Sequence, residues 1–203
     1  MTRESANELI DGFLGSAQIF ANALGQVLER RTWREASGGQ LGVTHLRVLK
    51  LAAGPWPSTI GDVAAFLRVS NAGASKAADK LVRLGLLERT AAEGDRRSVY
   101  ISLTEPGRRI LEAYDAALRG GLSEVFLSFA PEEIRQAIGF LDRIAVDIVR
   151  RAPHEDFCGQ CGIYYREECL FREQLRRQCA YLRQKGRTVR PAAAEGGLSG
   201  GAD

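Results

Sequence analysis

The stretch between Ser58 and Gly107 restricts the possible folds of this chain more than any other part of it. Apolar residues recur there at spacings of three and four, which predicts a helix that Ser58 can cap. Ser70 can cap a second helix that runs to about Leu84, and Gly85 suits the position just past its end. Two helices joined by so short a connection predict a helix-turn-helix.

Two short segments of alternating apolar and polar residues follow, at 86–89 and 98–102. Residues 92–95, Ala-Glu-Gly-Asp, are typical of the turn between two such strands. A helix-turn-helix followed by a β-hairpin is the layout of a winged helix, which puts one helix in a DNA major groove. We therefore expect a mainly α fold with a small β wing.

Long amphipathic helices are predicted on both sides of this core. One covers residues 5–31, another starts near Thr44, and two more start at Thr104 and at Pro131. A small winged helix cannot cover the apolar faces of all of them, so we expect a second copy of the chain to cover them across a two-fold axis. The alternative is a monomer whose helical part folds back on itself.

This pattern divides the chain into five expected parts. They are an N-terminal dimerisation helix at 1–36, a winged helix at 37–107, C-terminal dimerisation helices at 108–152, a cysteine-rich metal-binding appendage at 153–190, and a disordered tail at 191–203.

Composition sets the broad class of the protein. Apolar residues are 45% of the 203, which is enough for a core, and the net charge is only +3. No apolar run reaches about 18 residues, so we expect no membrane span. The N-terminal residues do not follow the pattern of a secretion signal, so we expect a cytoplasmic protein with reduced thiols.

The second helix of the predicted helix-turn-helix carries the candidate DNA contacts. Small residues at its start let a helix enter a groove, and its N-terminus attracts phosphate. Polar caps and solvated helix faces have the same composition, so each residue alone is weak evidence. The candidates are Ser70, Asn71, Ser75, Lys76, Lys80 and Arg83.

The predicted wing carries two guanidinium groups, on Arg96 and Arg97. An arginine at a wing tip can enter the minor groove, where the potential is most negative. Asp95 can pair with one of them and support the tip. The alternative is a loop that happens to carry a charge pair, which is less plausible between two strands that follow a helix-turn-helix.

The segments SNAGASKAADKLVRLGLLER, GDRRSVYISLTEPG and THLRVLKLA resemble the MarR family of bacterial transcription regulators, and the resemblance covers residues 5–150. It implies a homodimer on a pseudo-palindromic DNA operator, usually repressing nearby genes. It implies that Asn71, Ser75, Lys76 and Lys80 face the DNA and that Arg96 and Arg97 are wing contacts.

The same resemblance implies a pocket between the DNA-binding lobe and the dimer helices, where many members of the family bind small aromatic acids. Trp33, His45, Leu46 and Trp56 are the candidates for its lining. Tryptophan and leucine at such positions are more often core residues.

All four cysteines of the chain lie within a short C-terminal stretch, at Cys158, Cys161, Cys169 and Cys179. A C-x-x-C pair lets two thiolates reach one metal ion. Cys169 and Cys179 lie on an expected helix, where ten residues span about 15 Å, too far for one ion. Either that helix breaks or the metal takes another ligand, for which His154 is available.

Two cofactors suit this cysteine pattern. A zinc ion held by four thiolates would stabilise the short segment, whereas an iron–sulfur cluster would make the protein a redox or iron sensor. Reactive thiols that form a disulfide are a third interpretation, and four inert thiols a fourth. The MarR resemblance says nothing about this part, because typical members end near residue 150.

Two other functions compete with DNA binding. A metal-cluster redox protein, as an enzyme or electron carrier, is supported only by the cysteines, since we find no nucleotide-binding glycine loop and no catalytic grouping around His45 or His154. A protein-interaction module with a vestigial winged helix is disfavoured by Lys76, Arg96 and Arg97. We therefore expect a DNA-binding regulator and no enzymatic activity.

Overall fold

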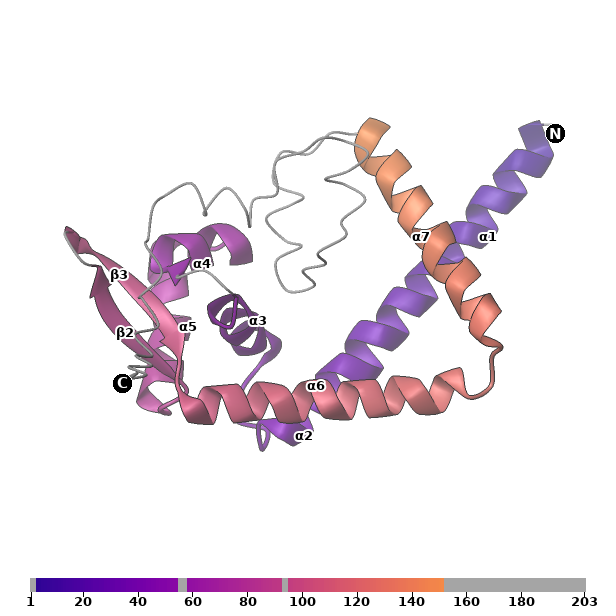
Figure 1. Ribbon diagram of the computed structural model, residues 1–203. Helices are drawn as coiled ribbons and strands as arrows, with labels where there is room; N and C mark the ends of the chain where they lie inside the picture. Colours follow the sequence, from indigo (N-terminus) through magenta and orange to yellow (C-terminus); the bar gives the residue numbers. More distant parts are fainter. Residues whose placement is uncertain (1–2, 55–57, 93–94, 152–203) are drawn as a thin grey trace, which may run out of the picture.

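The computed structural model describes residues 3–54, 58–92 and 95–151 (Figure 1). Its N-terminal segment is helical throughout, as α1 (Arg3–Asn22), the π-helical η1 (Ala23–Glu29) and α2 (Arg30–Ala36). The sequence predicts one helix over 5–31, so the helical path is longer and changes its hydrogen-bond register in the middle. Gly38 and Gly39, with φ of +60° and +74°, end it in a conformation that glycine adopts without strain.

Three helices form the helix-turn-helix lobe: α3 (Val43–Ala52), α4 (Ile60–Leu67) and α5 (Asn71–Arg83). The predicted cap of α5 is confirmed, because the Ser70 hydroxyl accepts the Gly73 N–H at 3.2 Å. The predicted cap of α4 is wrong. Ser58 is buried in the short strand β1 (Ser58–Thr59), and Thr59 caps the helix by accepting the Asp62 N–H at 3.2 Å.

The wing is a three-stranded antiparallel sheet in the order β1-β3-β2. Strands β2 (Leu87–Ala92) and β3 (Asp95–Leu103) are longer than the predicted 86–89 and 98–102. The backbone of Arg96 and Arg97 therefore belongs to β3, rather than to a loop after the turn.

Two long helices complete the described chain, α6 (Glu105–Phe126) and α7 (Pro131–Arg151). The predicted cap at Thr104 is confirmed: its hydroxyl accepts the Gly107 N–H at 3.2 Å and donates to the Gly85 carbonyl at 2.6 Å. Figure 1 shows α6 leading away from the sheet to α7, which crosses α1 far from the wing. Phe13 of α1 and Phe140 of α7 meet edge to face at 6.5 Å between ring centroids.

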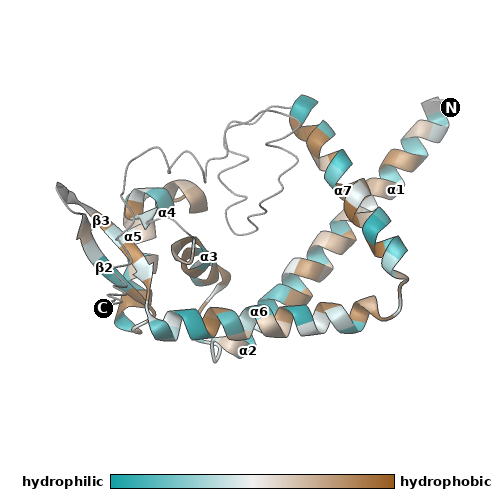
Figure 2. Ribbon diagram, in the orientation of Figure 1, coloured by the Kyte–Doolittle hydropathy of each residue, from teal (hydrophilic) through white to brown (hydrophobic). Residues whose placement is uncertain are grey.

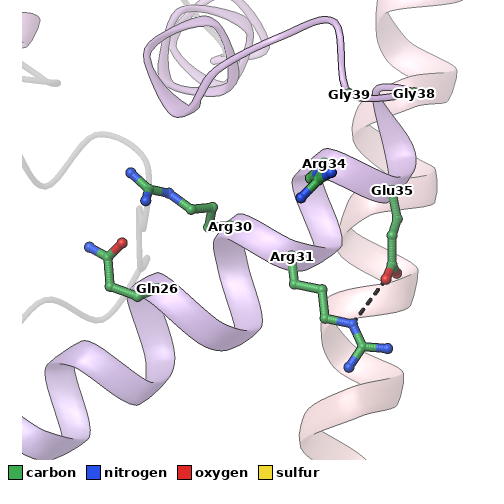
Figure 3. Close-up of a pocket in the computed structure, with 7 residues that line it drawn as sticks. All are labelled: Gln26, Arg30, Arg31, Arg34, Glu35, Gly38 and Gly39. Atoms are coloured by element: carbon green, nitrogen blue, oxygen red, sulfur yellow. Dashed lines mark hydrogen bonds and ion pairs between the residues drawn. The ribbon is translucent and has the colours of Figure 1, made fainter.

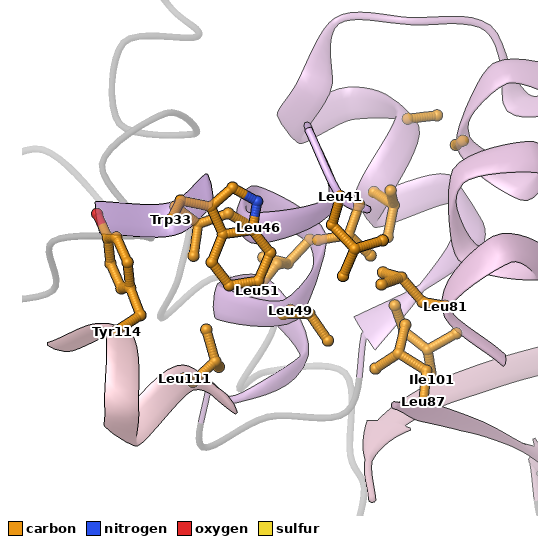
Figure 4. Packing of buried hydrophobic residues seen from close by; sticks show 14 residues of the cluster. Trp33, Leu41, Leu46, Leu49, Leu51, Leu81, Leu87, Ile101, Leu111 and Tyr114 are labelled. Atoms are coloured by element: carbon orange, nitrogen blue, oxygen red, sulfur yellow. The ribbon is translucent and has the colours of Figure 1, made fainter. Parts of the chain in front are cut away.

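A buried seam joins the N-terminal helix to the helix-turn-helix lobe (Figure 4). Trp33 of α2 is 1% exposed and meets Tyr114 of α6 edge to face at 5.8 Å. Leu46 and Leu49 of α3 belong to the same cluster. Lys50 of α3 lies 4.9 Å from the Tyr114 ring centroid, a cation–π contact. Side chains from α2, α3 and α6 thus share one core.

The backbone of Gly42 is held from two sides at this seam. The Trp33 indole N–H donates to the Gly42 carbonyl at 3.1 Å, and the Gly42 N–H donates to Nδ1 of His45 at 3.2 Å. Burial, and then the nearby Lys80 ammonium, lower the pKa of His45 below its ordinary value of 6.5. The connection at 37–42 is therefore fixed to the lobe by tertiary contacts as well as by the chain.

Large apolar side chains are left exposed at the far ends of the long helices (Figure 2). These side chains lie on α1, η1, the end of α6, the connection after it, and α7. The described residues form no layer that covers them. They are Leu9, Ile10, Leu14, Ile19, Phe20, Val27, Val125, Phe126, Leu127, Phe129, Ile138, Phe140, Leu141 and Ile148. Among the described helices, none combines the length and apolar character needed to cross a bilayer.

Gly107 packs too closely on the sheet to accept a side chain. A Cβ there would lie 2.0 Å from the Leu86 carbonyl oxygen, whereas a Cβ at Gly120 of the same helix would meet nothing within 4 Å. We predict that Gly107→Ala lowers the free energy of unfolding by roughly 1–3 kcal/mol. Gly120→Ala should be neutral or stabilising by up to about 1 kcal/mol. Urea unfolding at one fixed protein concentration measures both, and equal effects would contradict the close packing.

The lowered pKa of His45 predicts acid-sensitive stability. As the pH falls below about 6.5, the unfolded chain binds a proton at His45 before the folded chain does, so the free energy of unfolding decreases. His45→Gln should lose less stability than the wild type between pH 7.5 and pH 5.5, by urea unfolding. Identical pH dependence of the two proteins would show that His45 titrates normally when folded.

Candidate nucleic-acid interface

The exposed side of α5 carries polar and charged residues, whereas Ala74, Ala78 and Leu81 anchor its other side in the core. Asn71 and Lys76 are exposed in its first two turns. Small neighbours at the helix start leave these side chains free to approach a ligand. The predicted reading helix is therefore oriented with its polar face outward.

One flank of α5 is fastened to the wing through Arg89, which the sequence reading missed. The Arg89 guanidinium pairs with Asp79 at 2.7 Å and donates to the Ser75 hydroxyl at 3.3 Å. Ser75 also donates to Asp79 at 3.4 Å. Ser75, predicted to contact DNA, is thus part of a network that joins α5 to β2. The residue pattern of the strand does not predict this role of Arg89, because the partners of Arg89 lie on another element.

The opposite flank of α5 is fastened to the connection that precedes α3. The Lys80 ammonium donates to the Gln40 carbonyl at 2.8 Å. The two residues in this contact are forty positions apart in sequence, so no local sequence pattern predicts it. Lys80, predicted to face DNA, positions the 37–42 connection against the reading helix. Arg83, in the last turn of α5, is exposed.

Of the residues predicted to line an effector pocket, the structure describes Trp33, His45 and Leu46. Trp33 and Leu46 are core residues, at 1% and 4% exposed, and His45 is partly exposed beside Gly42. A hollow of about 610 Å³ lies elsewhere, beside α2 (Figure 3). Its lining consists of Gln26, Arg30, Arg31, Arg34, Glu35, Gly38 and Gly39. The alternative interpretation of Trp33 and Leu46 from the sequence, that they are core residues, describes the structure.

Several predicted site residues lie outside what the structure describes. These are the side chains of Asp95, Arg96 and Arg97, together with Trp56, His154, Cys158, Cys161, Cys169 and Cys179. Within the described ranges, no group of three or more His, Cys, Asp or Glu side chains is placed to hold a metal ion. The cysteine site therefore remains a prediction from sequence.

Comparison with known sequences matches the helix-turn-helix lobe. The MarR family model matches residues 44–98, from α3 into β3. YkoM, an uncharacterised HTH-type transcriptional regulator of Bacillus subtilis, is 26% identical over 147 residues, which are 72% of this chain and 95% of YkoM. YhjH of the same organism, also an uncharacterised HTH-type transcriptional regulator, is 26% identical over 128 residues, 63% of this chain and 73% of its own. Both relatives are named as transcription regulators and not as enzymes.

Solved structures share the whole described architecture. The YusO protein of Bacillus subtilis superposes with a TM-score of 0.57 at 21% identity, over 69% of this chain and 96% of YusO. FabT of Streptococcus pneumoniae, solved in complex with DNA, has a TM-score of 0.54 at 25% identity, over 70% of this chain and 99% of FabT. The MarR family model thus matches the lobe at residues 44–98, and the solved structures show the same fold, a winged helix-turn-helix with long flanking helices.

Proposed function

We propose that this chain is a sequence-specific transcription regulator that binds operator DNA. The observation that carries the proposal is the MarR-family match over the lobe in which α5 presents its polar face to solvent. The FabT structure in complex with DNA, at 25% identity, supports it. Such a protein works where the chromosome is, so we place it in the cytoplasm.

We further propose that the regulator is a homodimer. The exposed side chains of Leu127 and Ile19 are 87% and 72% accessible, on two of the segments that carry the apolar surface described above. Contiguous apolar surface of this kind on a protein mostly marks a binding partner. A second copy related by a two-fold axis would cover the exposed apolar surface of both chains. It would also place the two α5 helices about 34 Å apart, so that each lies in its own major groove. Occupying a promoter in this way favours repression.

A small aromatic acid remains a proposed effector. Trp33 and Leu46 fill the core, so such a ligand would have to enter beside His45 or displace packed side chains. Movement at this seam would reach the 37–42 connection through Gly42, and then α5 through Lys80. This route supports a regulatory role for the seam whichever ligand uses it.

We propose that the cysteine segment binds zinc or an iron–sulfur cluster and that the metal modulates DNA binding. Four cysteines within 158–179 supply enough thiolates for either group. The segment follows α7, which contacts α1 through Phe13 and Phe140 among the exposed apolar helices. A change in metal content would therefore first affect the helices that we assign to dimerisation.

The DNA-binding proposal predicts that α5 substitutions weaken operator binding. Lys76→Ala and Asn71→Ala should each cost about 1–3 kcal/mol of binding free energy in gel shifts with the protein's own promoter. Arg109→Gln, an exposed arginine of α6 that pairs with Glu105, is the matched control and should bind normally. Wild-type affinity should fall steeply as salt rises. An interaction module without DNA function would show no specific, salt-dependent shift.

The metal proposal predicts a measurable cofactor in anaerobically purified protein. A brown sample with a broad visible band indicates an iron–sulfur cluster, and a colourless sample with zinc by elemental analysis indicates zinc. Cys158→Ser combined with Cys161→Ser should lose the metal and change operator affinity. Metal loss that leaves operator affinity unchanged would reduce the site to a structural one, and equal metal content in variant and wild type would refute the site.

A further inference from the structure

The described residues that line the hollow beside α2 are charged or polar side chains and two glycines. Arg30, Arg31 and Arg34 contribute guanidinium groups, and Gly38 and Gly39, which follow the end of α2, contribute backbone only (Figure 3). Among the residues that the structure describes, no apolar or aromatic side chain lines it. Pockets for small organic ligands are mostly enclosed and apolar, with a few polar groups. The chemistry of this hollow instead suits an anion that remains largely in water.

The three arginines differ in how they are engaged. Arg31 pairs with Glu35 at 2.9 Å, and the hydrogen bond and charge of that carboxylate raise the pKa of Arg31. Arg30 and Arg34 lie one helical turn apart, and neither side chain has an ion-pair or hydrogen-bond partner among the residues that the structure describes. Two exposed guanidiniums on one side of α2 are therefore available to bind an anion. Guanidinium is well matched to phosphate, because it donates hydrogen bonds in a planar fork.

The hollow is connected to the reading helix. Gly38 and Gly39 belong to the connection whose Gln40 carbonyl accepts the Lys80 ammonium at 2.8 Å. The Gly39 N–H donates to the Arg34 carbonyl at 2.8 Å, so this connection stays close to Arg34 as well. A short series of hydrogen bonds thus leads from Arg34 to α5.

The connection and the wing lie on opposite flanks of α5. Ser75 and Asp79 contact Arg89 of the wing, whereas Lys80 contacts Gln40. At 100° per residue, Ser75 and Lys80 point about 140° apart around the helix, and Lys76 lies between them on the exposed side. A helix in the major groove has a phosphate backbone on each side. The wing contacts one flank, and the 37–42 connection, which directly follows α2 and its arginines along the chain, contacts the other.

We propose that Arg30 and Arg34 contact DNA phosphates on the flank of α5 opposite the wing, in addition to the contacts of the reading helix and the wing. The proposal rests on the proposed function as an operator-binding protein. Phosphate contacts position a protein on DNA without reading its sequence. The arginine pair therefore strengthens binding to any sequence and leaves the preference for the operator to α5.

The test compares the salt dependence of DNA binding in full-length proteins. Each phosphate contact contributes about −0.9 to the slope of log affinity against log salt concentration. Arg30→Gln combined with Arg34→Gln removes two contacts from each subunit of the proposed dimer. It should therefore make the slope about 3.6 units shallower and weaken operator and non-operator duplexes by the same factor. Arg108→Gln combined with Arg109→Gln is the control, because both arginines are exposed and pair with Glu105 on α6. The control should keep the wild-type slope, and melting curves of both variants verify folding.

A wild-type slope in the folded Arg30/Arg34 variant would overturn the proposal while leaving the operator-binding function in place. A thermal shift with sodium benzoate that requires Arg30 and Arg34, with the slope unchanged, would assign the hollow to a small acid and also overturn it. Failure of the wild-type protein to bind any operator would instead reject the proposed function itself, which separates the two ideas.

Discussion

The Trp33 side chain joins the two halves of the molecule, and the placement of the other elements depends on it. Its ring packs edge to face on Tyr114 of α6, and its N–H holds the Gly42 carbonyl before α3. A buried aromatic pair adds roughly 0.5–1.5 kcal/mol beyond its area burial. Because the indole N–H of Trp33 has the Gly42 carbonyl as its partner, burying this ring leaves its own donor paired. Loss of this seam would remove the aromatic contact between α2 and α6 and the hydrogen bond that joins α2 to the start of α3.

Two polar contacts orient α5 relative to the rest of the lobe. Lys80 holds the helix to the 37–42 connection, and Arg89 holds it to the wing through Asp79. The Asp79 carboxylate would repel phosphate if it were free, and Arg89 neutralises it. The reading helix is therefore held on both flanks while its exposed side stays open. The same arrangement carries any movement of the seam to the helix that we assign to operator recognition.

Local chemistry was sufficient to predict much of this fold. The caps at Ser70 and Thr104 and the glycine after α5 are read from residue type and spacing, and the structure has them. The cap at Ser58 was predicted wrongly, because a strand pairing with Ile101, more than forty residues away, takes up its backbone. Tertiary pairing overrode the local preference.

The candidate site was less predictable for the same reason. Which side chains lie on the exposed face of α5 follows from helical periodicity, but the partners of Lys80 and Arg89 lie on other elements. Whether Trp33 fills a core or lines a pocket depends on α6, which no pattern around residue 33 reveals. The spacing of Arg30 and Arg34 is plain in the sequence, whereas the contact between α5 and the connection that follows their helix is not.

We propose that a second copy of this chain covers the apolar surface of α1, α6 and α7 and so pairs the two reading heads. Sedimentation equilibrium of the full chain at micromolar concentration tests it most directly. The account predicts one species with twice the chain mass of 22.2 kDa. A single species at 22.2 kDa under these conditions would contradict it.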